Sequence, residues 1–197
     1  MRRASEGTER RIIEAAYYLF YRKGFTRVSM DEIAARARLT KRTLYAHIRS
    51  KDDLLAATLQ RYSEFDRKRL RAIAERLPTE TAAMIDSFFG QMIEWASKPR
   101  WAGSGFTRLV IELADLPGHP ARAIARRAKG VTEAWLAELL AEKKLPHPRE
   151  RARELMLLME GAMALMLIHG DRTYGSAAAR AAKRLIGIRG QDKPQKP

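Results

Sequence analysis

The sequence predicts an all-α protein, and three observations support this. Alternating apolar and polar runs bounded by paired turn residues, which indicate strands, are almost absent. Alanine, leucine, arginine and glutamate, which favour helix, are abundant. Apolar residues also repeat at helical spacing, as Ile12, Ala16 and Leu19 do near the amino terminus.

The length and composition limit the protein classes to consider. A chain of 197 residues suffices for one or two compact helical units and is short for a large multidomain enzyme. Its longest apolar run, residues 155–168, is interrupted by Glu160 and falls short of the roughly 20 residues of a membrane span. The absence of cysteine excludes disulfides and thiolate zinc sites and suits a reducing compartment, so we expect a cytoplasmic protein.

The basic charge is concentrated near the amino terminus. The whole chain has a formal net charge of +15, and residues 1–50 contain 12 Lys or Arg against 5 Asp or Glu. A basic excess of this kind is typical either of a polyanionic partner or of a generally basic proteome. Because the charge is denser in the first quarter, the distribution favours a nucleic-acid-binding amino-terminal module.

Helix-start and helix-stop signals place three helices in this module. The first should run from about Thr8 to Lys23 and end at Gly24. A capping box of Ser29 and Glu32 predicts a second helix over residues 29–37. After a turn of only three residues, the N-cap Thr40 predicts a third helix that ends near residue 48.

Two short helices joined by such a turn match the helix-turn-helix that enters a DNA major groove. With Leu44 and Ile48 on the inner face, polar side chains are left outward on the second of the two helices. Their guanidinium, ammonium and hydroxyl groups can bind base edges or phosphates. The pattern alone is equally compatible with solvated residues on an ordinary surface helix.

Two stretches carry a resemblance to a known family. They are IEAAYYLFYRKGF at residues 13–25 and SMDEIAARARLTKRTLYAHIRSKDDLL at residues 29–55. Together they resemble the DNA-binding domain of the TetR/AcrR transcriptional regulators. The sequence departs from the family pattern at Arg38, where the family usually has glycine, and at Ile48, where it usually has phenylalanine.

The resemblance implies a three-helix DNA-binding domain joined by a long helix to an α-helical ligand-binding and dimerisation domain. On this basis we expect a DNA-binding domain at residues 1–52, an effector-binding and dimerisation domain at 53–188, and a disordered tail at 189–197. It further implies DNA contacts by the following residues: Thr40, Lys41, Arg42, Thr43, Tyr45, His47 and Lys51. Further helices are expected over residues 50–76, 80–97, 104–114, 120–143, 149–169 and 176–187.

The family assembles as dimers and binds small effectors, so the resemblance implies a homodimer with a double-stranded DNA operator and an effector as partners. Residues 155–168 are apolar nearly all round and therefore need burial on two faces. Gly161, Ala162 and Ala164 permit close helix approach, as in a four-helix dimer bundle. A central helix of a monomeric core is the alternative.

Methionine and aromatic residues, which adapt to varied apolar ligands, suggest an effector pocket. The candidates for this pocket are Phe88, Met92, Trp95, Phe106, Leu109, Glu112, Trp135, Met159 and Met163. Ordinary core packing is the alternative for each apolar member. Glu112 could meet a cationic ligand, but a salt bridge to Arg108, Arg153 or another basic side chain is the favoured interpretation.

These features predict a ligand-responsive repressor that binds a palindromic operator as a homodimer. An enzyme is not expected, because the four histidines lack metal-ligand spacing and no phosphate-binding glycine loop is present; no metal or other cofactor is predicted. The alternative function is constitutive DNA binding without effector control, and activation in place of repression also stays open.

Overall fold

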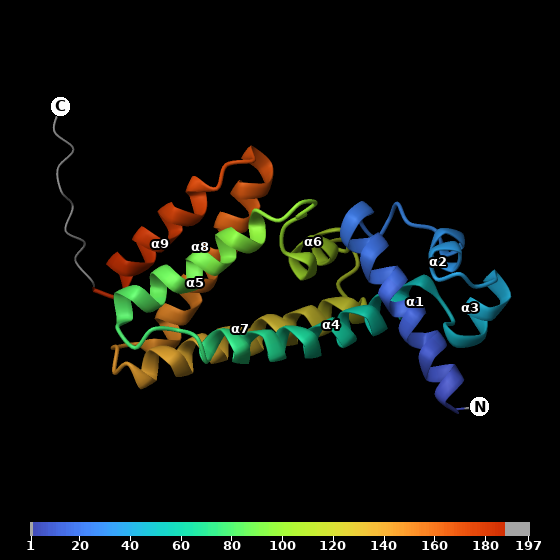
Figure 1. Cartoon of the computed structure of the whole chain (residues 1–197), viewed down its shortest axis with the longest axis horizontal. Coiled ribbons are helices and arrows are strands. Elements are labelled where there is room, and N and C mark those ends of the chain that lie inside the picture. The colour runs from blue at the N-terminus through green and yellow to red at the C-terminus, as the bar shows by residue number, and fades with distance from the viewer. Residues whose placement is uncertain (1, 188–197) are drawn as a thin grey trace. The chain divides into compact units, whose positions relative to one another are not determined.

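The computed structural model describes residues 2–187, with side chains from Glu6 onward, and the tail predicted at 189–197 lies outside this range. The described residues form helices and loops without any strand, which confirms the all-α prediction. The helices in chain order are α1 (Arg2–Lys23), α2 (Met30–Arg36), α3 (Lys41–His47), α4 (Lys51–Ala74), α5 (Thr81–Ala96), α6 (Gly105–Ile111), α7 (Pro120–Glu142), α8 (Pro148–His169) and α9 (Thr173–Leu185) (Figure 1). None of these helices is both long enough and apolar enough to cross a membrane.

The helices pack into two compact units. The first contains the chain up to Arg69 together with Ser104–Lys129, and the second contains Leu70–Gly103 and the chain from Gly130 onward. The long helices α4 and α7 each contribute to both units. Packing thus groups α6 and the first part of α7 with the helix-turn-helix, while the functional domain limits expected at residue 52 stay a prediction.

The first unit is built around side chains from α1 to α4 and α6. Phe20, Ile33, Leu44 and Leu54 are all completely buried in one apolar cluster. Each comes from a different helix, and burial of such a side chain contributes about 1.5–3 kcal/mol. This shared core holds α2 and α3 in a defined position on α1.

The second unit is a helical bundle in which α9 packs on both α5 and α8. Its core includes the fully buried Phe89, Leu140 and Met166. Close approach of α9 to α5 depends on Gly175, because a Cβ there would lie 2.5 Å from Cγ1 of Ile93. A side chain at this position would force the two helices apart.

Most predicted helix ends agree with the structure within a few residues, and two starts differ more. Helix α1 begins at Arg2, six residues before the predicted N-cap Thr8, because no proline interrupts the intervening residues. Helix α9 begins at Thr173, because the Asp171 carboxylate accepts hydrogen bonds from the Thr173 amide at 2.8 Å and its hydroxyl at 2.7 Å. These hydrogen bonds also lower the pKa of Asp171.

Candidate nucleic-acid interface

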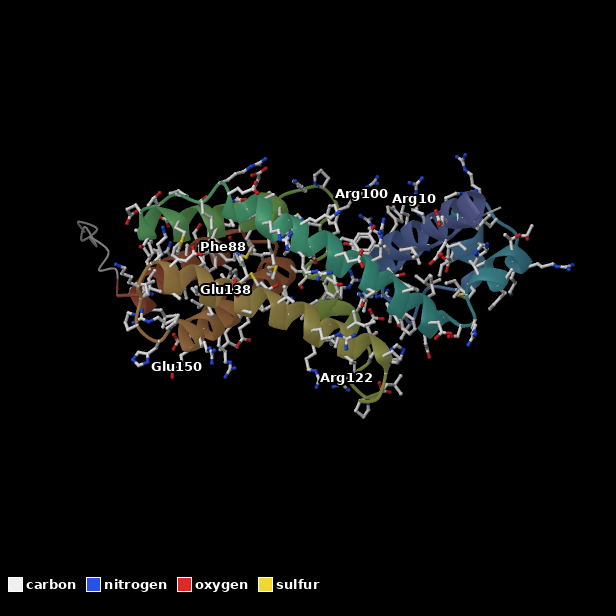
Figure 2. The ribbon with its side chains drawn as sticks, turned by 90° about the horizontal axis from the view of Figure 1, so that it is seen from below. Arg10, Phe88, Arg100, Arg122, Glu138 and Glu150 are labelled. Carbon is white, nitrogen blue, oxygen red and sulfur yellow. The ribbon has the colours of Figure 1, made fainter. Side chains whose placement is uncertain are left out.

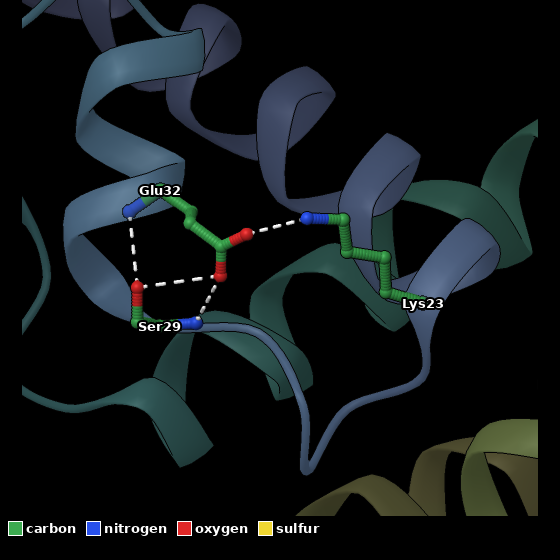
Figure 3. Close-up of polar contacts among 3 residues, drawn as sticks. All are labelled: Lys23, Ser29 and Glu32. Carbon is green, nitrogen blue, oxygen red and sulfur yellow. Dashed lines mark hydrogen bonds and ion pairs between the residues drawn. The ribbon is translucent and has the colours of Figure 1, made fainter.

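The capping box predicted at the start of α2 is present and is tied to α1 (Figure 3). The Glu32 amide donates to Ser29 Oγ at 3.2 Å, and the Ser29 amide donates to Glu32 Oε2 at 2.9 Å. The Lys23 ammonium, at the end of α1, donates to the other carboxylate oxygen. These contacts lower the pKa of Glu32, and the hydrogen bond from Lys23 has the largest effect. One carboxylate therefore caps α2 and fixes it to α1.

The turn between α2 and α3 is closed by a left-handed residue. Arg38 has φ of +54°, its amide donates to Ala35 O at 3.0 Å, and the Leu39 amide donates to Ala34 O at 2.9 Å. This is the Schellman arrangement, in which glycine is the usual left-handed residue. The guanidinium of Arg11 on α1 donates to the Ala37 and Arg38 carbonyls. The turn thus adopts the Schellman arrangement although it lacks glycine.

Helix α3, the recognition helix of the predicted motif, presents a polar outer face. Its inner face is anchored by Leu44, which is completely buried, and by Ile48 directly after the helix. The Thr43 amide donates to Thr40 Oγ1 at 3.1 Å, which confirms Thr40 as the N-cap. The side chains predicted to touch DNA lie on the other face, where Thr40, Lys41, Arg42 and Tyr45 are exposed and Thr43 and His47 are half-buried.

The two predicted lysine contacts have partners in the free protein. The Lys41 ammonium pairs with Asp31 of α2 at 2.9 Å, which raises the pKa of Lys41. Lys51 donates to the Thr26 carbonyl at 3.3 Å and lies 4.5 Å from the centre of the Phe25 ring. Burial lowers the pKa of Lys51. Because an ammonium has three protons, Lys51 retains donors for a phosphate while it holds this loop.

The nine predicted effector residues fall into both units. Six of them belong to the second unit, namely Phe88, Met92, Trp95, Trp135, Met159 and Met163. Phe88, Met92 and Met163 are buried there, and the Phe88 and Trp135 rings lie 6.1 Å apart. In the first unit, Leu109 is buried in the core and Phe106 lines a cavity next to α7.

Glu112, directly after α6, bonds to the loop between α1 and α2. Its Oε2 accepts hydrogen bonds from the Thr26 amide and hydroxyl, both at 3.0 Å, so its partner is Thr26 rather than Arg108 or Arg153. A Cβ at Gly24, which has φ of +88°, would come within 2.5 Å of Glu112 Oε1. Glycine is therefore required there both for the helix stop and for the approach of this carboxylate.

Sequence reasoning missed a second link to this loop, at His119 between α6 and α7. The imidazole is buried, its Nδ1 accepts a hydrogen bond from the Ala121 amide at 3.1 Å, and its ring packs edge-on against Phe25. Its Nε2 lies 3.6 Å from Asp52 Oδ1 at the start of α4. The flanking prolines suggested only a loop residue, since no local pattern indicates contacts this distant in sequence.

Within the residues that the structure describes, α2 and α3 form a helix-turn-helix on a core shared with α1, and α3 has a polar outer face. Residues 12–58 match the model of the bacterial regulatory proteins of the tetR family. This match identifies residues 12–58 as a DNA-binding domain of the TetR type, which is typical of transcriptional regulators.

Individual relatives are similar over short stretches. The chain is 50% identical over 40 residues to an uncharacterised helix-turn-helix regulator, YdeS, of Bacillus subtilis, covering 20% of each chain. It is 41% identical over 59 residues to the transcriptional repressor SCO4008 of Streptomyces coelicolor, covering 30% of this chain and 31% of the relative. The matches thus span less than a third of these relatives' length.

The fold as a whole has matches among solved structures. The TetR-family regulator SCO4454 of Streptomyces coelicolor superposes with a TM-score of 0.81 and 24% identity, covering 91% of this chain and 95% of that one. A TetR regulator from Streptomyces avermitilis gives a TM-score of 0.71 and 27% identity, covering 89% and 98%. The family's fold therefore extends over nearly the whole chain.

Proposed function

We propose that the protein is a repressor that binds a palindromic operator as a homodimer and is released by a small effector. The observation that carries the DNA-binding part is the anchored recognition helix, with Leu44 buried beneath it and Arg42 exposed at its amino-terminal end. One relative is named a repressor, which supports repression over activation.

Binding to DNA is tested by separating base reading from phosphate contact. Arg42 can form a bidentate contact with guanine, whereas Lys51 can meet a phosphate only as a point charge. We expect Arg42→Ala to cost about 1–3 kcal/mol on the cognate site and much less on random DNA. Lys51→Ala should weaken both DNAs alike and lower the salt-dependence slope by about one for each phosphate that is no longer neutralised.

Both variants are compared with the wild type at several salt concentrations, on the DNA that footprinting identifies and on random DNA. Thermal unfolding of each variant controls for the contacts of Lys51 with Thr26 and Phe25. If Arg42→Ala lost affinity equally on both DNAs, with a reduced slope and unchanged base preference, Arg42 would be a phosphate contact. An asymmetric footprint with one half-site would contradict the palindromic operator.

Dimer formation is supported by an exposed apolar face on α8. Leu157, Gly161, Leu165 and Ile168 are exposed and follow one another at intervals of four, four and three residues. The exposed Ala164, three residues after Gly161, lies on the same face. Leu157 and Ile168 are 71% and 72% exposed, which leaves an apolar stripe without cover in the single chain. A second copy of α8, related by a two-fold axis, would bury this stripe.

The effector response distinguishes this proposal from constitutive DNA binding. A ligand that binds the folded state must raise the apparent unfolding temperature as its concentration increases. We therefore expect a compound from a thermal-shift screen both to stabilise the protein and to release it from its footprinted DNA. Stabilisation without release, for every stabilising compound found, would favour the constitutive alternative.

A further inference from the structure

A cavity of about 460 Å³ lies in the first unit, between α6, the loop after it and the first half of α7. Its α6 side is formed by the apolar side chains of Phe106, Val110 and Ile111. Ile111 is 67% exposed, although a side chain of this size is usually buried. The volume lies within the range of about 300–1,000 Å³ that is typical of small-molecule sites.

The α7 side of the cavity is basic. Arg122, Arg126 and Lys129 line it at spacings of four and three residues, which places them on one face of the helix. No Asp or Glu lines the cavity, and none occurs between residues 116 and 132 of the sequence. Among the lining side chains, an anion bound here would therefore meet several positive charges and no negative one.

The basic side chains differ in how far they are already engaged. Arg122, near the start of α7 (Figure 2), uses one nitrogen to donate to the Leu113 and Ala114 carbonyls at 3.4 and 3.2 Å. This contact holds the guanidinium of Arg122, which lines the cavity, by one of its nitrogens. Within the part of the chain that the structure describes, Arg126 forms no ion pair with a carboxylate. Arg126 is thus free to pair with an acidic ligand group.

We propose that this cavity binds an organic anion with an apolar body, such as an aromatic or aliphatic carboxylate or sulfonate. The apolar body lies against α6, where burial removes it from water, and the acidic group lies against α7, where charge-assisted hydrogen bonds form. A neutral molecule of the same shape cannot form these charge-assisted hydrogen bonds, and a cation is repelled by the basic side chains of α7. The inference rests on the proposed effector response and names the chemical class of the effector.

The position of the cavity suits this role. His119, which lines it, also contacts Phe25 and faces Asp52, and Glu112 follows directly after the lining residue Ile111. A ligand between α6 and α7 therefore touches the segment that holds the loop before α2.

The test uses two fluorescent probes with the same aromatic body, anilinonaphthalene sulfonate and its uncharged parent N-phenylnaphthylamine. Both are titrated into the full-length wild type and into Arg126→Ala, Arg127→Ala and Val110→Trp. Arg127 is the matched control, because it is the exposed neighbour on the same helix and does not line the cavity. Val110→Trp fills the apolar side of the cavity.

We expect the wild type to bind the sulfonate roughly ten-fold more tightly than the neutral probe. Arg126→Ala should remove most of this preference for the sulfonate and leave the affinity for the neutral probe unchanged. Arg127→Ala should change the affinity for neither probe, and Val110→Trp should weaken the binding of both probes. Equal wild-type affinities, or equal losses in the two arginine variants, would overturn the proposal, since the second result indicates only attraction to the general basic charge.

A parallel assay of DNA release separates this inference from the proposed function. If the sulfonate binds as expected but the protein stays bound to DNA, the result supports the proposed ligand class and contradicts the proposed effector response. If a neutral or cationic compound releases the DNA equally well from the wild type and from Arg126→Ala, the result supports the ligand-responsive repressor. It contradicts the proposal that the effector is an anion bound in this cavity.

Discussion

At the scale of single residues, Arg38 carries a conformational cost that a substitution can remove. Its φ of +54° is unfavourable for a residue with a Cβ, by about 1 kcal/mol. We expect Arg38→Gly to raise the free energy of unfolding by about 0.5–1 kcal/mol, since glycine's greater freedom in the unfolded chain offsets part of the gain. Denaturant unfolding measures the change.

Arg38→Ala is the matched control for this prediction. Alanine removes the guanidinium but keeps the Cβ, so it should leave the unfavourable φ unrelieved. Equal stabilisation by both substitutions would show that the charge of Arg38, and not its backbone conformation, is the source of the cost.

Glu112 is the second residue whose contribution to the stability of the fold can be measured. Its carboxylate accepts two hydrogen bonds from Thr26, and a hydrogen bond to a charged group contributes about 1.5–3 kcal/mol when shielded. Because Glu112 is only half-buried, we expect Glu112→Ala to lower the free energy of unfolding by about 1–2 kcal/mol. The exposed Asp115 gives a control, since Asp115→Ala should have little effect; similar losses in both variants would contradict the structural role of Glu112.

At the scale of elements, the cap of α2 should make stability depend on pH. The contacts with Lys23 and Ser29 lower the pKa of Glu32 from 4.5, so the folded state favours its charged form. This stabilisation is fully present above pH 4.5 and is lost as the pH falls through the lower pKa of the folded state. Glu32→Gln should therefore be less stable than the wild type near neutral pH, and the difference should shrink in acid.

Unfolding curves of both proteins at a series of pH values measure this difference. Asp115→Gln, which alters an exposed carboxylate after α6, is the control and should give no comparable pH-dependent difference. If the difference in the free energy of unfolding between the wild type and Glu32→Gln persisted unchanged in acid, Glu32 would act through packing and not through its charge.

At the scale of the whole molecule, the exposed stripe on α8 predicts the oligomeric state. Two chains of 22.4 kDa should sediment together at micromolar concentration. We expect Ala164→Arg to shift the protein to the mass of a single chain, because a charge in an apolar two-fold interface meets its own copy. Residue 164 is exposed in the single chain, so the variant should keep its helical circular dichroism.

Ala141→Arg is the control for assembly, because it adds the same charge at an exposed position of α7 in the same unit. Its mass should equal that of the wild type. A monomeric wild type would contradict the dimer outright, and a dimeric Ala164→Arg variant would place the interface elsewhere.

The helical class and the helix-turn-helix were predictable from local sequence, because the signals for them act between near neighbours. The caps at Ser29 and Thr40 and the stop at Gly24 each depend on residues within four positions, and the structure confirms all of them. The family resemblance rested on the same local stretch. The DNA contacts of the recognition helix stay predictions, although its polar face is exposed as expected.

Contacts between residues distant in sequence depend on how the helices pack in three dimensions. Thr26 and Glu112 are 86 positions apart, and the sequence showed the isolated carboxylate but not its partner. The predicted effector residues share mainly an apolar or aromatic character, and packing assigns six of them to one unit and three to the other. The basic side of the cavity was also not singled out, because exposed arginines look alike in sequence. Local capping depends on the adjacent backbone, whereas a partner across the fold depends on how helices pack, which no short pattern specifies.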